Sequence, residues 1–171
     1  YGDLLDGCAA IIGKVPLAGL HTDEGRLATH ELRLELTDGE LADPSLPHLL
    51  GIIMGRAVGT AVPVLTGLPS VEEDALKAIA AAAATSGAVE MFHAVGVTPE
   101  APTFADATGG RPVDRVTVVD REALAKARTL LTTTDSEQID SVCLGTPHFS
   151  IDEFGALREA LAGRHVHDDV R

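Results

Sequence analysis

Aromatic residues are scarce in this sequence: 171 residues include no tryptophan, one tyrosine and four phenylalanines. Proteins that bind single-stranded nucleic acid stack its bases on aromatic side chains, and this chain has little material for such a surface. Basic residues are also few, since 13 Lys and Arg stand against 26 Asp and Glu, giving a formal net charge of −13. This charge repels phosphate backbones and anionic lipid surfaces. We therefore expect neither nucleic acid nor a membrane as a partner.

Cysteine is scarce as well, and the two cysteines, Cys8 and Cys143, form no C-x-x-C pair. They cannot build a disulfide framework, which favours a reducing, cytoplasmic location. The sequence has no signal-peptide pattern and no run of about 18 apolar residues, so it gives no support for secretion or a membrane span. The first residue is not Met and an apolar helical pattern is under way at Leu4, from which we expect a fragment of a longer polypeptide.

Several catalytic and binding motifs are missing. The sequence contains no G-x-G-x-x-G after a strand and no G-x-x-x-x-G-K-[ST], the loops that bind dinucleotides and nucleoside triphosphates. It also lacks G-x-S-x-G, H-E-x-x-H and the calcium loop of EF-hands. The commonest enzyme classes built on these motifs therefore have no sequence support here.

Hydrophobic residues make up 45% of the chain, and its length suits one α/β domain over residues 1–171. Short apolar runs of strand length lie near residues 30, 62, 90, 116, 141 and 166, mostly separated by helical patterns. This alternation predicts an α/β fold, a layered αβα domain with a largely parallel sheet. A helix with one apolar face is predicted over residues 3–13. Cys8 lies on that face, and we expect it in the core.

The stretch from residue 139 to 164 carries the first candidate site. Residues 139–144 have the pattern of a strand, and Ser150 followed by Glu153 is a capping-box signal for a helix start. Ligands of α/β sheets bind where strand ends meet helix N-termini, so Thr146, His148 and Ser150 are candidate site residues. The alternative is plain turn chemistry with a satisfied, partly buried histidine.

A second candidate site is the polar loop over residues 19–26, G-L-H-T-D-E-G-R. His21, Glu24 and Arg26 place an imidazole, a carboxylate and a guanidinium within six positions, which suits acid–base work or substrate binding. The alternative is a solvated connector. Two further histidines lie in predicted strands: His30 is expected to be structural, and His93 to lie either in the core or at a site.

Several phrases in one order resemble the large segment of the aconitase X family. These phrases are Y-G-D-L-L-D with P-L-A-G-L-H-T-D-E-G-R, then S-G-A-V-E-M-F-H-A-V-G-V-T-P-E-A-P, and finally C-L-G-T-P-H-F-S. The similarity covers nearly the whole chain, which would form the middle of that segment. The resemblance implies an aconitase-like hydro-lyase built from α/β domains around an iron–sulfur cluster, with a smaller swivelling segment or subunit completing the active site.

Family activities include dehydration of cis-3-hydroxy-L-proline and of a mevalonate phosphate, so the resemblance implies a small hydroxy-acid substrate. Some members carry G-C-P-H where this chain has Thr146, and the form G-T-P-H-F-S is closer to the hydroxyproline branch. A cluster needs about three or four thiolates. We therefore expect no metal ligand within this chain and place the cluster ligands in the rest of the enzyme.

Dehydration of a hydroxy acid needs a holder for the carboxylate, a base for the neighbouring proton, and an acid or metal for the departing hydroxyl. We expect Thr146, His148 and the helix start at Ser150 to fill the first or third role. His21, Glu24 and Arg26 are expected to approach the same cleft. The resemblance assigns the base to the swivelling segment, so the isolated chain is expected to be inactive.

Two other functions remain open at this point. A non-enzymatic module could bind a small anion at its strand-end loops, independently of iron. A structural domain would instead dock other segments and expose an apolar patch of several hundred Å².

Overall fold

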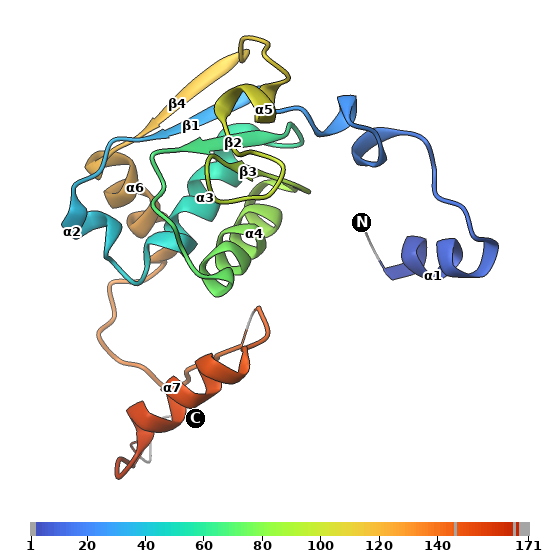
Figure 1. Ribbon diagram of the computed structural model, residues 1–171. Coiled ribbons are helices and arrows are strands. Elements are labelled where there is room, and N and C mark those ends of the chain that lie inside the picture. The colour runs from blue at the N-terminus through green and yellow to red at the C-terminus, as the bar shows by residue number, and fades with distance from the viewer. Residues whose placement is uncertain (1–2, 146, 166, 168–171) are drawn as a thin grey trace.

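A computed structural model of the chain describes residues 3–145, 147–165 and 167. The described residues form a four-stranded sheet in the order β3-β2-β1-β4, with every strand parallel to its neighbours (Figure 1). The strands are β1 (His30–Leu34), β2 (Pro63–Thr66), β3 (His93–Ala94) and β4 (Arg115–Val119). His30 lies opposite Pro63 on one side and Arg115 on the other. The predicted α/β fold with a parallel sheet is confirmed.

Three helices cover one face of the sheet: α3 (Leu46–Val58), α4 (Glu73–Gly87) and α6 (Arg121–Leu131) (Figure 1). The main hydrophobic core lies between this helical layer and the strands; its fully buried members include Leu32, Leu50, Met54, Leu65, Ile79 and Val119. The short helix α5 (Phe104–Thr108) lies over the other face, on a second cluster made of Ala28, Val62, Val64, Ala101 and Ala107. Burial of these apolar surfaces is the main force holding the layers together.

Helices α3 and α4 pack with almost no space between their backbones. A Cβ on Gly87 would lie 1.8 Å from the carbonyl oxygen of Gly55, and one on Gly51 would lie 2.5 Å from Ala82 Cβ. Small residues at these positions allow the close approach. The alanine-rich stretch of α4 therefore serves packing, as its composition indicates, with α3 as its closest neighbour.

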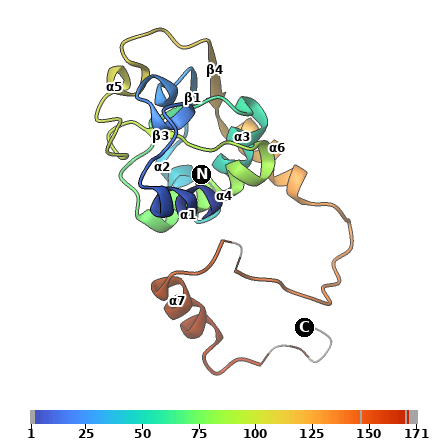
Figure 2. The ribbon, with the colours of Figure 1, turned by 90° about the vertical axis from the view of Figure 1, so that its right-hand side faces the viewer.

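Helices α1 (Asp3–Ile12) and α7 (Ile151–Leu161) lie outside the sheet and its helices (Figures 1 and 2). The prediction of Cys8 in the core is wrong: its thiol is exposed, as are Leu4 and Ile11, which are 87% and 85% exposed. The apolar stripe of α1 is present, but no described element packs against it. None of the described helices is long and apolar enough to cross a membrane.

Two predicted strands are not formed. Residues 139–144 have no strand structure, and Ile139 and Leu144 are 64% and 63% exposed. A strand is stabilised by hydrogen bonds to a neighbour, and this segment lies against none in the described part of the chain. In the expected strand at residues 165–167, His165 and His167 are not in strand structure, and Val166 lies outside the described residues.

Local chemistry moves three other boundaries. The strand predicted over residues 88–95 shrinks to β3, because α4 continues to Gly87 and Ala88 ends it in a left-handed conformation. Residues 103–112, which include the pair Gly109-Gly110, contain α5, which starts with a capping box between Thr103 and Asp106. Ser70 and Glu73 have the spacing of a capping box but form none, since α4 begins at Glu73 itself.

Candidate functional site

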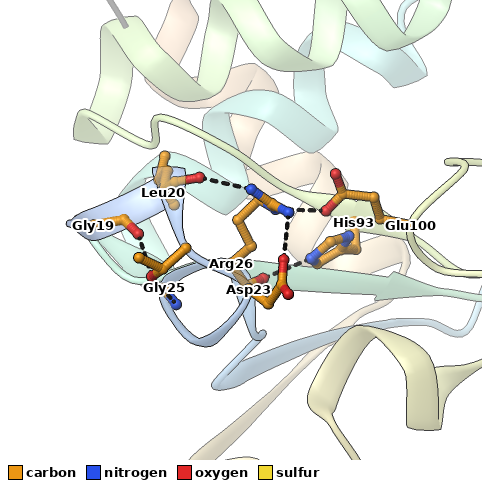
Figure 3. Close-up of polar contacts among 8 residues, drawn as sticks. Gly19, Leu20, Asp23, Gly25, Arg26, His93 and Glu100 are labelled. Atoms are coloured by element: carbon orange, nitrogen blue, oxygen red, sulfur yellow. Dashed lines mark hydrogen bonds and ion pairs between the residues drawn. The ribbon is translucent and has the colours of Figure 1, made fainter. Parts of the chain in front are cut away.

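The loop over residues 19–26 is compact and lies at the amino end of β1. Two 3-10 turns, Gly19–His21 and Glu24–Arg26, are joined through Thr22, whose hydroxyl donates to the Gly19 carbonyl at 2.9 Å (Figure 3). A Cβ on Gly25 would lie only 1.9 Å from that same carbonyl oxygen. Only glycine fits there, so this loop has one defined shape.

Arg26 is the centre of this loop, and each of the three nitrogens of its guanidinium contacts a protein acceptor. Nε lies 2.9 Å from Glu100 Oε2, one terminal nitrogen lies 2.9 Å from Asp23 Oδ1, and the other donates to the Leu20 carbonyl at 3.0 Å (Figure 3). Glu100 comes from the loop after β3, so the pair joins two segments far apart in sequence. These contacts use three of its five N–H donors, and we interpret Arg26 as a residue with a structural task at this edge of the sheet.

His93 lies beneath Arg26 and is 3% exposed. Its Nε2 is 2.8 Å from the Arg26 carbonyl oxygen, which can only accept, so Nε2 carries the proton (Figure 3). Its Nδ1 is buried and has no partner among the described residues. Beside it is a small cavity of about 120 Å³, lined by Asp23, Arg26, Leu27, His93, Glu100, Asp106 and Ala107. The cavity is small, and three of its seven lining residues are acidic.

Glu24 connects the loop over residues 19–26 to the segment before β4. Its two carboxylate oxygens lie 2.5 and 2.8 Å from the terminal nitrogens of Arg111. These hydrogen bonds and the charge of Arg111 lower the pKa of Glu24 below its usual value. Both side chains are exposed, and exposed pairs contribute little to stability.

A second polar cluster joins the first turn of α4 to the start of α7. Lys77 Nζ lies 2.8 Å from Asp74 Oδ1 and 2.6 Å from Glu153 Oε2, and it donates to the His148 carbonyl at 3.2 Å. The Ser150 hydroxyl donates to Asp74 Oδ2 at 2.6 Å. We call these four side chains, Asp74, Lys77, Ser150 and Glu153, the α4–α7 latch. The imidazole of His148 itself is exposed.

Lys77 and the two carboxylates of the latch stabilise one another's charges, whereas the charge of Asp74 by itself raises the pKa of Glu153. Hydrogen bonding by Lys77 lowers the pKa of Asp74, with a further contribution from Ser150, and it lowers the pKa of Glu153, with a further contribution from the Ser150 backbone. The hydrogen bonds to Asp74 and Glu153 raise the pKa of Lys77.

We predict that the latch stays closed from about pH 5 to about pH 10. The carboxylates contribute fully above their ordinary pKa values of 3.8 and 4.5, and their contribution is lost as the pH falls through the lowered values. The contribution of Lys77 is present below 10.5 and is lost as the pH rises through its raised pKa. An NMR titration of the Ser150 amide should have its acidic midpoint below 4.5. A midpoint at the ordinary glutamate value would contradict this prediction.

The structure does not bring the two predicted groups of site residues together. Glu24 and Arg26 lie before β1, at the amino ends of the strands, and His21 lies on the turn just before them. The latch, with Ser150 and the carbonyl of His148, lies at the first turn of α4, which follows the carboxyl end of β2. The expectation of one shared cleft therefore fails for these described residues. Thr146 lies outside them.

Ser150 starts α7 as predicted, and the capping box with Glu153 is formed. Its hydroxyl donates to Asp74 and accepts from the Glu153 amide at 3.1 Å, so its one proton is already donated within the protein. We interpret Ser150 as a residue that holds the loop in place. His30 is structural as predicted: it is 5% exposed, and its Nε2 lies 2.9 Å from the Thr117 hydroxyl.

Sequence reasoning missed Asp74, Lys77, Glu100 and Arg111. The only local signal was the spacing of Asp74 and Lys77, which puts both on one face of a helix. Their partners lie more than 70 residues away in sequence, so periodicity could not reveal them.

The described residues contain no group of three or more His, Cys, Asp and Glu that could hold a metal ion. Cys8 and Cys143 are free and exposed, and they lie in segments at opposite ends of the chain. An iron–sulfur cluster takes about three or four thiolates. The described part of this chain therefore does not fit such a cluster by itself.

Comparison with known proteins gives a consistent result. Residues 28–129 match the family model of the aconitase X second domain. Cis-3-hydroxy-L-proline dehydratases from Pseudomonas aeruginosa and Hypocrea jecorina are 42% and 40% identical over 99% of this chain. The large subunit of phosphomevalonate dehydratase from Methanothermobacter thermautotrophicus is 41% identical over 90% of this chain. The matched region makes up 36% of that subunit. The chain spans about 29% of the length of the two hydroxyproline dehydratases.

A solved structure agrees with these sequence matches. The holo-form of aconitase X from Thermococcus kodakaraensis superposes with a TM-score of 0.78 at 28% identity, covering 95% of this chain and 40% of that one. The superposition covers more of the chain than the sheet and its covering helices alone. The parallel sheet, the match to residues 28–129 and the similarity along the remainder lead to one conclusion: this chain belongs to the aconitase X family.

Proposed function

We propose that the chain is part of a hydro-lyase that removes water from a small hydroxy acid, with cis-3-hydroxy-L-proline as the substrate. The observation that carries this proposal is the similarity of 40–42% over 99% of the chain to two proteins named for that activity. Identity of 41% to a phosphomevalonate dehydratase subunit supports the reaction type independently of the substrate. The remaining large segment and a swivelling small segment or subunit complete the proposed enzyme.

The reaction takes a proton from the carbon that bears the carboxylate and hydroxide from the next carbon, where the two electrons of the broken C–H bond form a C=C bond. The hydroxide leaves as water once it receives a proton. An acid near the hydroxyl lowers the barrier of that step, and such proton transfer typically accelerates reactions by about 10²–10⁴-fold.

We assign the contact with the departing hydroxyl to His148, and Thr146, two residues earlier in the sequence, is a second candidate for this contact. An imidazole ring can donate or accept a proton, which suits a contact with a departing hydroxyl. The exposure of His148 at the carboxyl side of the sheet supports this assignment, since ligands of such sheets bind there. His21, Glu24 and Arg26, the other group of expected site residues, are assigned to holding the opposite edge of the sheet.

An iron–sulfur cluster, if the complete enzyme carries one, takes its ligands from segments outside this chain in our proposal. The steps assigned to His148 and Thr146 concern binding and proton transfer and do not involve those ligands.

The test is turnover by the full-length protein, purified without oxygen and offered cis-3-hydroxy-L-proline or phosphomevalonate in separate reactions. We expect loss of water from the hydroxyproline and none from phosphomevalonate. Turnover of phosphomevalonate alone would overturn the substrate assignment and keep the reaction type. Binding of either acid without turnover, by folded and iron-loaded protein, would instead support a small-anion-binding module.

A further inference from the structure

Lys77 is the meeting point of two elements that are distant in sequence. Its Nζ contacts Asp74 on its own helix at 2.8 Å, Glu153 on α7 at 2.6 Å, and the carbonyl of His148 at 3.2 Å. An ammonium group has three protons to donate, and here each has an acceptor. The side chain is 29% exposed, so it is partly shielded from water.

Asp74 makes a second connection between α4 and the start of α7. One of its oxygens faces Lys77, and the other accepts the Ser150 hydroxyl at 2.6 Å. Ser150 and Glu153 also close the capping box of α7, with the Ser150 amide 2.7 Å from Glu153 Oε2. The start of α7 is therefore fixed to α4 through two side chains of α4 and through its own cap.

The contacts hold the chain on both sides of Phe149. Lys77 binds the carbonyl of His148, and Asp74 binds the hydroxyl of Ser150, while the imidazole of His148 stays exposed. A side chain presented from a backbone fixed at these points keeps a narrow range of positions. Catalysis depends on such placement, and a displacement of about 1 Å can lower a rate by about 10²-fold.

We propose that Asp74 and Lys77 are positioning residues: they fix residues 148–153 against α4 and thereby set the place of the His148 imidazole at the substrate. The role of His148 rests on the proposed function above. The attachment of residues 148–153 to α4 does not depend on the proposed function. The attachment and the role of His148 can therefore be tested separately.

The test uses the full-length protein with Lys77→Met, which keeps the length of the side chain and removes its charge. Lys126→Met is the matched control, since Lys126 Nζ lies 2.6 Å from Glu122 Oε1 within α6. That pair joins no second element. We expect Lys77→Met to lower kcat for cis-3-hydroxy-L-proline about 10- to 100-fold with little change in KM, and Lys126→Met to change neither by more than about twofold.

A double variant separates positioning from general loss of structure. In a His148→Ala background, Lys77→Met should cause little further loss of kcat, because the group that it positions is already gone. A full additional loss in that background would overturn the proposal, and so would a Lys77→Met protein with the activity of the Lys126→Met control.

Amide hydrogen exchange tests whether Lys77 fixes the start of α7 to α4. This test does not require activity on cis-3-hydroxy-L-proline. Lys77→Met should raise the exchange rates of the Glu153 and Phe154 amides, the first of which donates to Ser150 Oγ and the second to the Ser150 carbonyl. Equal exchange rates of these amides in the Lys77→Met and Lys126→Met proteins would overturn the proposal that Lys77 fixes the start of α7. Absence of turnover with raised exchange would reject the proposed function and keep the latch.

Discussion

Replacing Gly87 with alanine is expected to lower the free energy of unfolding by about 3 kcal/mol, the upper part of the range for overpacked cores. The new Cβ would lie 1.8 Å from the carbonyl oxygen of Gly55, 2.2 Å from its carbonyl carbon and 2.5 Å from its Cα. All three are backbone atoms, so no side chain can turn aside to make room. The helices α3 and α4 must move apart, and the core between them loses contacts.

Gly155→Ala is the control for this prediction. Gly155 also lies inside a helix, but a Cβ there meets no atom within 4 Å. Alanine should be neutral or stabilise α7 by up to about 1 kcal/mol, the difference in helix propensity. Urea unfolding of both variants measures the difference. Equal stability of Gly87→Ala and the unsubstituted protein would show that α3 and α4 are not packed as described.

His148→Ala in the full-length enzyme is expected to lower kcat for dehydration by about 10²–10⁴-fold, the usual contribution of a positioned acid or base. The side chain is exposed, so its removal should leave the fold and the melting temperature almost unchanged. His165→Ala is the matched control, because His165 is also exposed and has no assigned role. Steady-state kinetics and circular dichroism of both variants provide the measurement.

A His148→Ala enzyme that keeps more than about a third of its activity would contradict the assignment of this residue. A lower KM together with a lower kcat would instead indicate that His148 opposes binding of the unreacted substrate.

The fold could be predicted because its signals are local. The alternation T-H-E-L-R-L-E-L is typical of a half-buried strand and contains β1. Asp120 has a side chain suited to a helix start, and its carboxylate accepts the Ala123 amide at 2.9 Å at the beginning of α6. The same signals failed where an element lacks a neighbour. Residues 139–144 have the composition of a strand, but the described residues offer them no strand to pair with. Cys8 lies on the apolar face of α1, and that face is exposed to solvent.

Glu31 is a buried carboxylate in β1. It is 6% exposed, although it alternates with the apolar residues of that strand. Burial raises its pKa, but hydrogen bonds from Arg33 at 2.8 Å and Thr66 at 2.7 Å outweigh burial and keep that pKa below its usual value. Thr66 belongs to β2, so this environment depends on strand pairing that periodicity does not specify.

The candidate site was predictable only in part. The start of α7 at Ser150 was predictable because the two residues of its capping box, Ser150 and Glu153, are close in sequence. The link from Ser150 to Asp74 spans 76 residues and depends on how α7 lies against α4. Likewise, the grouping of His21, Glu24 and Arg26 with the His148 loop required knowledge of which edge of the sheet each loop occupies.

The central claim is that the loop over residues 145–150 meets the substrate of a dehydratase. The most direct measurement is a crystal structure of the full-length His148→Ala protein with cis-3-hydroxy-L-proline, which this variant should bind without consuming. We expect the substrate hydroxyl to lie beside position 148, next to the α4–α7 latch. A substrate bound beside Arg26, or at a site that no residue of 145–150 reaches, would contradict it.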